Sequence, residues 1–389
     1  MPGRRRPIIV AAPDSFKGSA SAAAAAEAML RGAREVFGDA AEYRALPLAD
    51  GGEGTLDALL AAWGESARTV ETTDALGRLR QARWGLSADR ATAVIEAAEA
   101  NGLPWVADVP QRPLEADTAG VGGIALAALD AGARELLLCI GGSATSDGGV
   151  GMLTALGARF LDADGSPVRP GAAGLADIAS IDASGLDPRA HEARWRIAVD
   201  VDNPLCGPRG AGAVFGPQKG AGDADIAVID AGLGHLAQLL AAQAGQPAAA
   251  LVERPGMGAA GGLALTAVAL LGAETLPGSD MVADAIGVAE TLRGASLVLT
   301  GEGRLDSQSL GGKVVDLVRR RAPQGAPVVV IAGGVLLTAA ECRAAGITAA
   351  FSIADGPAAL DDLVERADER IAETAAHACA LLAASLPAP

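Results

Sequence analysis

One stretch of this sequence, Ala295–Lys313 (ASLVLTGEGRLDSQSLGGK), combines carboxylates, hydroxyls and glycines in a way that suits a metal-phosphate site. The apolar run Ser296–Leu299 near its start is typical of a buried strand. Glu302, Arg304 and Asp306 follow among glycines, and we expect them on a loop, where functional residues concentrate.

Lys313 opens a segment with helical periodicity, so the stretch predicts a strand, a polar loop and a helix. In open α/β sheets such loops leave the carboxyl ends of the strands, where ligands bind. The N-terminus of the following helix favours anions. We favour a ligand site here, and the alternative is an ordinary connecting loop with solvated polar residues.

Two similar units lie near the start of the chain. A strand is predicted at Pro7–Ala12, and a helix that Ser19 or Ser21 caps runs to about Val36. A second strand is predicted at Tyr43–Leu48, with a helix after it. The loops between strand and helix carry the candidate residues Asp14, Ser15, Lys17, Asp50 and Glu53.

A glycine-rich loop, Gly141–Gly151, follows an apolar strand predicted at Leu136–Ile140. Its free backbone N–H groups and hydroxyls suit phosphate or carboxylate recognition, with a purely structural turn as the alternative. Its candidate side chains are Ser143, Thr145, Ser146 and Asp147.

Two further clusters complete the candidate set. Asp200, Asp202 and Asn203 follow a strand predicted at Arg196–Val199, and their oxygens are hard ligands of the kind magnesium takes. Lys219 stands beside glycine and proline in the next motif.

Composition sets limits on function. The 389 residues favour two domains, and half of them are apolar, enough for sizeable cores. A net charge of −16 disfavours nucleic-acid and anionic-membrane partners. The four cysteines and three histidines are scattered and form no zinc pattern. The spacing of the cysteines does not suggest disulfides, so a reducing cytoplasm fits best. No apolar run is long enough for a signal peptide, and we expect none to span a membrane.

Strands alternate with helices at both ends of the chain, which predicts a parallel sheet built from both terminal regions. We therefore expect a discontinuous α/β domain, residues 1–70 and 285–389, with a second α/β domain, residues 71–284, inserted. The active site is expected in the cleft between them.

No Ser-His-Asp or Cys-His arrangement stands out, whereas lysines, carboxylates and glycine loops are the parts of a phosphoryl-transfer site. Two other classes stay open. A nicotinamide-dependent oxidoreductase acting on a small hydroxy acid would use the GxGxxG match at Gly256–Gly261, which does not follow a convincing strand. A non-catalytic protein that binds an anion or metal is the second. A P-loop is absent.

Taken together and in order, the motifs resemble those of the bacterial glycerate kinase family, the type unrelated to P-loop kinases. The resemblance extends over nearly the whole chain. It rests on Ala12–Gly18 (APDSFKG), Leu48–Thr55 (LADGGEGT), Gly141–Gly149 (GGSATSDGG), Asp200–Leu205 (DVDNPL), Phe215–Gly220 (FGPQKG) and Thr300–Asp306 (TGEGRLD).

The resemblance implies ATP-dependent phosphorylation of D-glycerate, most often at the 2-hydroxyl to give 2-phosphoglycerate, with phosphorylation at the 3-hydroxyl as the alternative. It also implies magnesium, a flavodoxin-like domain made of both chain ends, and an inserted α/β domain. The expected partners are small molecules, and the oligomeric state, a homodimer included, stays open.

We assign roles as hypotheses, since positioning and charge neutralisation carry most of such a reaction. Asp200 or Asp306 accepts the hydroxyl proton, and Lys17 and Lys219 bind the substrate carboxylate or the transferred phosphoryl group. Lys313 is a further candidate for that binding, or is merely solvated. Substrate or phosphate contacts are assigned to Asp14, Ser15, Ser143, Thr145, Ser146, Asn203 and Arg304, and magnesium to Asp50, Glu53, Asp147 and Glu302.

Overall fold

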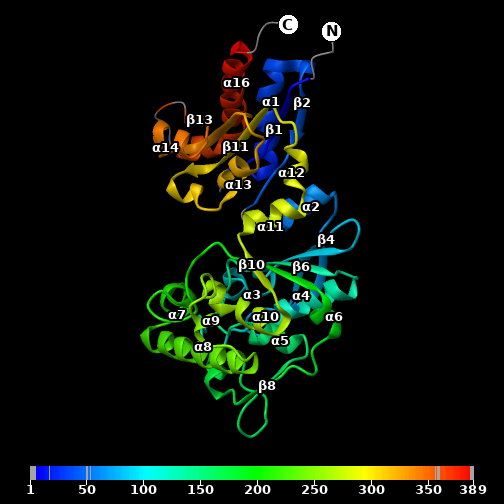
Figure 1. The fold of residues 1–389 in the computed structure, drawn as a ribbon. Helices are drawn as coiled ribbons and strands as arrows, with labels where there is room; N and C mark the ends of the chain where they lie inside the picture. Colours follow the sequence, from blue (N-terminus) through cyan, green and yellow to red (C-terminus); the bar gives the residue numbers. More distant parts are fainter. Residues whose placement is uncertain are drawn as a thin grey trace. The chain divides into compact units, whose positions relative to one another are not determined.

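The computed structural model describes residues 6–16, 18–49, 51–52, 54–354, 356 and 360–385. The chain forms two compact units, shown in Figure 1. The outer unit holds the described residues before Gly51 and from Val282 onward, and the inserted unit is Gly51–Met281. The sequence predicted these boundaries at 70/71 and 284/285. The predicted cleft between the two units stays a prediction.

The first boundary differs because helix α2 (Thr55–Trp63) packs within the inserted unit. A Cβ atom on Gly85 of that unit would lie 3.0 Å from both Leu56 and Leu60 of α2. The inserted unit also begins and ends at one place, because a Cβ on Gly51 would lie 2.5 Å from the Cα of Gly278.

The outer unit is built on a five-stranded parallel sheet of order β13-β12-β11-β1-β2. In chain order this is 2-1-3-4-5, the order of the flavodoxin-like fold, so the predicted fold class is confirmed. Its strands are β1 (Ile8–Ala11), β2 (Glu42–Ala45), β11 (Leu297–Leu305), β12 (Val328–Val335) and β13 (Ala349–Ser352).

Helices cover both faces of this sheet because successive strand residues point to opposite faces. Ile9 and Ala11 of β1 pack into the core beneath α1 (Ala22–Phe37) and α16 (Ala367–Ser385). Val10 packs into the opposite core. The other helices of this unit are α12 (Val288–Thr291), α13 (Val314–Arg321), α14 (Ala339–Ala344) and α15 (Leu360–Glu365); α11 (Gly278–Ala285) joins the two units.

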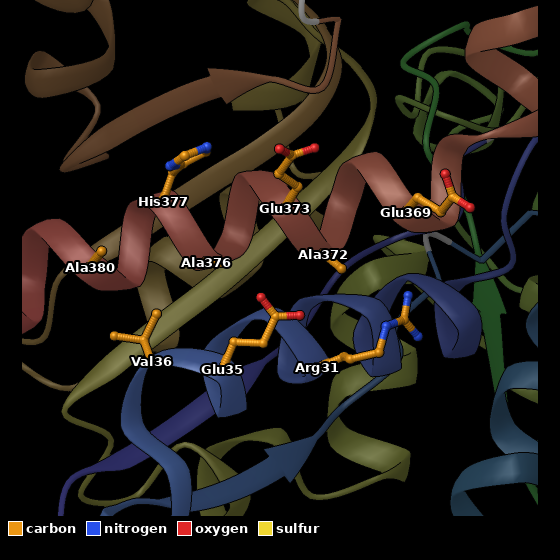
Figure 2. A pocket seen from close by; sticks show the side chains of 9 residues that line it. All are labelled: Arg31, Glu35, Val36, Glu369, Ala372, Glu373, Ala376, His377 and Ala380. Atoms are coloured by element: carbon orange, nitrogen blue, oxygen red, sulfur yellow. The ribbon is translucent and has the colours of Figure 1, made fainter.

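Helices α1 and α16 lie side by side, as Figure 2 shows. Ser21 caps α1 by accepting a hydrogen bond from the backbone N–H of Ala24, which confirms one of the two predicted caps. A hollow of about 660 Å³ lies along the two helices, lined by alanines and by the charged side chains Arg31, Glu35, Glu369, Glu373 and the ring of His377. None of the predicted site residues that the structure describes lines it.

The inserted unit is built on a six-stranded sheet of order β10-β9-β6-β5-β4-β3. Strands β10, β9, β6 and β5 are parallel, and β4 and β3 extend the sheet antiparallel. The strands are β3 (Arg68–Thr73), β4 (Leu79–Leu86), β5 (Thr92–Glu96), β6 (Glu135–Cys139), β9 (Arg194–Ala198) and β10 (Glu274–Leu276), and β7 (Arg159–Leu161) pairs with β8 (Ser180–Asp182) as a separate hairpin.

Helix α8 (Asp223–Gln243) is long and apolar enough, by length and composition alone, to cross a membrane. A single helix of this kind is weak evidence for a membrane span, so it does not contradict the expectation that no segment spans a membrane. Leu233, Leu236 and Leu240 of α8 are buried in the core of the inserted unit, so we interpret it as a core helix. The remaining helices are α3 (Ala98–Asn101), α4 (Ala119–Asp130), α5 (Val150–Ala155), α6 (Pro188–Glu192), α7 (Ala211–Phe215), α9 (Ala249–Val252) and α10 (Ala264–Leu271).

The loop predicted after Leu299 is instead a continuation of strand β11, which runs to Leu305. Thr300, Glu302 and Arg304 pair in register with Val330, Ala332 and Gly334 of β12. The glycines of this segment suggested a loop, but Gly301 serves close packing, since a Cβ there would lie 2.0 Å from the carbonyl oxygen of Ile331.

We predict that Gly32→Ala destabilises the outer unit by about 1–3 kcal/mol, because a Cβ there would lie 2.0 Å from the carbonyl oxygen of Ala372 in α16. Gly234→Ala in α8 is the matched control. Its Cβ would meet only the sulfur of Cys206 at 3.7 Å, so helix propensity should stabilise the inserted unit by about 0.5–1 kcal/mol. Urea unfolding measures both, and a stabilised Gly32→Ala variant would contradict the packing argument.

Candidate functional site

In the outer unit, Asp14, Ser15 and Glu302 lie at the carboxyl edge of the sheet. The backbone N–H of Asp14 donates to the carbonyl of Gly301 at 2.8 Å, and the Thr300 hydroxyl donates to the carbonyl of Ala12 at 2.8 Å. The carboxylate of Asp14, largely buried, accepts the backbone N–H of Ser15 at 2.6 Å. The structure therefore brings together residues that are almost three hundred positions apart.

Arg304, Asp306 and Lys313 follow on the same strand and turn. The Arg304 guanidinium pairs with Oδ2 of Asp306 at 3.1 Å, and Oδ1 of Asp306 accepts the backbone N–H of Gln308 at 2.9 Å. Both oxygens of Asp306 are thus engaged in a turn. Lys313 is the N-cap residue of α13, not its first helical residue.

In the inserted unit, the loop after β6 is organised by Asp147, whose side chain is fully buried. Its Oδ2 accepts the backbone N–H and the hydroxyl of Thr118 at 3.0 and 2.8 Å and the N–H of Gly151 at 3.0 Å. Its Oδ1 accepts the N–H of Gly149 at 3.1 Å. Burial raises the pKa of Asp147 and these hydrogen bonds oppose that shift. Four donors fit the ionised carboxylate.

This environment disfavours the predicted role of Asp147 in binding magnesium. Both of its oxygens are already committed to protein donors, and a hard cation needs those same lone pairs. We interpret Asp147 as the anchor of the Gly141–Gly151 loop.

Lys219, also almost fully buried, lies against the same loop. Its ammonium donates to the carbonyl of Thr145 at 2.5 Å. Burial lowers the pKa of Lys219 to about 8, and the negative charge of Asp147 acts in the opposite direction. A cation is therefore held inside the unit, and among the described residues its ammonium has one acceptor, the Thr145 carbonyl.

Two hydroxyl groups of the loop that contacts this cation have no hydrogen-bond partner among the described residues. The side-chain oxygens of Ser143 and Ser146 are buried and have no hydrogen-bond partner among the described residues. Buried hydroxyls normally find partners, so these two are candidates to bind a ligand. A lysine with spare donors and free hydroxyls can bind a small anion, such as a carboxylate or a phosphoryl group.

Two residues of this cluster were not foreseen as site residues. The buried Asn101 donates from its side-chain amide to the Thr145 hydroxyl at 3.0 Å. The Thr118 hydroxyl donates to the Asp147 carboxylate. Asn101 lies five residues beyond the end of strand β5, so its place after a parallel strand was the available signal.

Asp200 and Asn203 follow β9, the neighbour of β6 in the sheet, so their loop leaves the same edge as the Gly141–Gly151 loop. Oδ1 of Asp200 accepts the N–H of Gly278 at 2.9 Å. The amide of Asn203 donates to the carbonyl of Arg209, and the exposed Asp202 pairs with the Arg209 guanidinium.

Lys17, Asp50 and Glu53 lie outside the described residues. Among the residues that the structure describes, no group of three or more Asp, Glu, His or Cys side chains could hold a metal ion.

The GxGxxG match serves packing. A Cβ on Gly258 would lie 2.2 Å from the carbonyl oxygen of Pro204, and one on Gly261 would lie 2.2 Å from that of Thr145. The segment follows α9 and not a strand, so it lacks the context of a dinucleotide fingerprint.

The chain matches the model of the "Glycerate kinase family" over residues 9–383. The chain belongs to this family. It is 44% identical to a protein named glycerate kinase from Bacillus subtilis, covering 94% of this chain and 95% of the relative. It is 41% identical to a protein named glycerate 2-kinase from Escherichia coli, covering 96% and 98%.

A solved structure agrees with this assignment. The crystal structure of a putative glycerate kinase 2 from Salmonella typhimurium LT2 has a TM-score of 0.88 and 42% identity, and the match covers 98% of this chain and 99% of that one. The resemblance inferred from the motifs is therefore confirmed, and this member of the glycerate kinase family is an enzyme, a kinase. The oxidoreductase and non-catalytic alternatives are not supported.

We predict that Asp147→Asn lowers the free energy of unfolding of the inserted unit by about 2–4 kcal/mol, because the amide would point an N–H group at backbone donors. Urea unfolding measures the change. Asp164→Asn, at an exposed turn, is the control and should stay within about 0.5 kcal/mol. Equal stability of the two variants would show that Asp147 does not anchor the loop.

We predict that one lysine of this kinase titrates near pH 8. The chain has three lysines, Lys17, Lys219 and Lys313, so NMR of protein labelled at the lysine side-chain nitrogen can follow each. The signal that Lys219→Arg removes should titrate near 8 and not near 10.5. Because the unfolded chain holds that proton more tightly, this group should disfavour folding below pH 8, and the cost should be relieved as pH rises towards 10.5. A Lys219 midpoint near 10.5 would refute its burial as a cation.

Proposed function

We propose that this enzyme transfers the γ-phosphoryl group of ATP to D-glycerate, at the 2-hydroxyl, giving 2-phosphoglycerate and ADP. The family assignment and the names of the relatives support the substrate, and the name of the Escherichia coli relative supports the 2-position. Phosphorylation at the 3-hydroxyl is the alternative that the experiment below distinguishes.

The observation that carries this proposal is the buried cation of the inserted unit. The Lys219 ammonium is tied to the Thr145 carbonyl and lies against a loop with two buried hydroxyls that have no protein partner. A buried ammonium group attracts negative charge strongly, because the dielectric constant around it is low. Together with the unpartnered hydroxyls of the loop, it favours a small anion over a neutral sugar as the ligand. We assign the glycerate carboxylate to Lys219, Ser143 and Ser146.

In this scheme the substrate hydroxyl oxygen attacks the γ-phosphorus, its proton passes to a carboxylate, and ADP leaves with the electrons of the broken P–O bond. We favour Asp200 over Asp306 as the proton acceptor, because Asp200 lies in the same unit as the proposed carboxylate site, whereas Asp306 caps a turn of the outer unit. Asp200 leaves the same sheet edge as the Gly141–Gly151 loop.

Magnesium, when bound, would neutralise charge on the ATP phosphates. The described carboxylates Asp14, in the loop after β1, and Glu302, within β11, fit a cation of this kind, since magnesium commonly takes one or two carboxylates together with substrate phosphates. Asp50 and Glu53, predicted as further ligands, lie outside the described residues. In this proposal Arg304 and Lys313 contact phosphate oxygens, and Lys17 binds an anionic group.

The four cysteines are free thiols, and three of them are buried. Thiols without disulfide partners are consistent with our proposal that the enzyme works in the reducing cytoplasm.

The test is to incubate the protein with ATP, Mg²⁺ and D-glycerate and to couple the product to enolase with no mutase present. We expect a signal, because only 2-phosphoglycerate is a substrate of enolase. Release of ADP that depends on D-glycerate but gives no enolase signal would move the phosphate to the 3-hydroxyl. If neither the enolase signal nor D-glycerate-dependent release of ADP is seen, the proposed substrate is overturned.

We predict that Asp200→Asn lowers kcat by about 10²–10⁴-fold, because an amide cannot accept the hydroxyl proton. The amide oxygen can keep the hydrogen bond from Gly278, so folding should be preserved. Asp202→Asn, on the same loop and exposed, is the matched control and should keep near-normal kcat. Asp306→Asn should have the smaller effect, since an amide can still cap the turn; the reverse order would make Asp306 the base.

A further inference from the structure

Asn101 connects two elements of the inserted unit. It is the last residue of the short helix α3, which follows strand β5. Its backbone carbonyl accepts a hydrogen bond from the N–H of Ala144 at 2.8 Å. Its side-chain amide donates to the hydroxyl of Thr145 at 3.0 Å. Leu103 adds a hydrogen bond to the carbonyl of Gly142 at 3.0 Å. Asn101 therefore contacts two consecutive residues of the Gly141–Gly151 loop, Ala144 and Thr145.

Thr145 in turn holds the cation. Its hydroxyl accepts from Asn101, and its carbonyl accepts from the Lys219 ammonium at 2.5 Å. Gly261 packs closely against this carbonyl, because an added Cβ there would lie 2.2 Å from the Thr145 oxygen. With its acceptor site occupied by Asn101, the Thr145 hydroxyl has its own proton left to donate.

The other end of the Asn101 amide is an acceptor that the protein leaves unused. Its Oδ1 atom is buried and has no hydrogen-bond partner among the described residues, as is true of the Ser143 and Ser146 hydroxyls of the loop that it holds. A buried amide normally satisfies both ends, so a free acceptor and two free hydroxyls in one cluster indicate a polar molecule with both donors and acceptors. A 2-hydroxy acid has a hydroxyl donor and carboxylate acceptors.

We propose that Asn101 is a positioning residue for the acceptor substrate: through Thr145 it fixes the place of the Lys219 ammonium that binds the substrate carboxylate. Its free Oδ1 then accepts a hydrogen bond from a hydroxyl of the same molecule. This inference rests on the proposed function, since it assigns the acid and not the nucleotide to this cluster. It predicts that loss of Asn101 weakens binding of D-glycerate and leaves ATP unaffected.

The first measurement is steady-state kinetics of the full-length Asn101→Leu variant, which removes both ends of the amide at similar volume. We expect KM for D-glycerate to rise about tenfold or more, the equivalent of one lost hydrogen bond, and KM for ATP to change less than about twofold. Asn101→Asp, which cannot donate to Thr145 when ionised and places a negative charge in the cluster that binds the substrate carboxylate, should also raise KM for D-glycerate and leave KM for ATP within about twofold. This isosteric variant also keeps the test decisive if Asn101→Leu does not fold.

Matched controls separate positioning from stability. Thr72→Val removes another buried hydrogen bond of the same unit, from the Thr72 hydroxyl to the carbonyl of Gly120, and should leave both KM values unchanged. Thr145→Val should raise KM for D-glycerate as Asn101→Leu does, Thr145→Ser should restore it, and the Asn101→Leu, Thr145→Val double variant should be little worse than either alone. Additive effects would overturn the connection through Thr145.

A readout that does not depend on turnover separates failure of this inference from failure of the proposed function. In protein labelled at the lysine side-chain nitrogen, Asn101→Leu should move the Lys219 signal and leave that of Lys313 in place. If the wild type does not phosphorylate D-glycerate but this shift occurs, the proposed substrate fails and the positioning of Lys219 by Asn101 stands. If the wild type is active and Asn101→Leu alters neither KM nor the Lys219 signal, the inference is overturned.

Discussion

The buried carboxylate of Asp147 is the interaction on which the candidate site of the inserted unit depends. A glycine-rich loop has little conformational preference of its own, and a single acceptor with four donors fixes it. The same charge lies near enough to Lys219 to oppose the lowering of its pKa by burial. One ion therefore both orders the loop and helps to keep a buried lysine charged.

This arrangement explains why lysine and not arginine occupies position 219. The chain has 31 basic residues, of which three are lysines, so arginine is its usual cation. A guanidinium is planar and has five donors to satisfy, whereas an ammonium is compact and can be tied by one carbonyl with two N–H groups to spare. Inside a closed polar cluster, the smaller cation leaves room for an anionic ligand.

Much of the fold could be predicted from the sequence, because short apolar runs and glycine-rich segments indicate strands and the loops that follow them. Apolar runs such as Leu136–Ile140, followed by glycine loops, indicated parallel strands, and the alternation at both chain ends indicated the outer sheet. Strand β11 was predicted too short, because Gly301 looks like a loop residue until the partner strand that needs its small size is known. Asp147 looked like a metal ligand, since carboxylates that anchor loops and those that bind metals share one sequence signature. Asn101 was missed because its role depends on Thr145, which is distant in sequence.

The close approach of Gly51 and Gly278 has a consequence for how the outer unit forms. Strands β1 and β11 are neighbours in one sheet although the whole inserted unit separates them in sequence. Closing so long a loop in an unfolded chain costs entropy, which grows with loop length. Once the inserted unit has folded, its two ends are joined at this contact, and the halves of the outer sheet are separated by only the short segments that lead into it. We therefore expect the outer sheet to form more easily after the inserted unit has folded. The outer sheet would then depend on the core of the inserted unit, although no strand of the outer sheet belongs to that core.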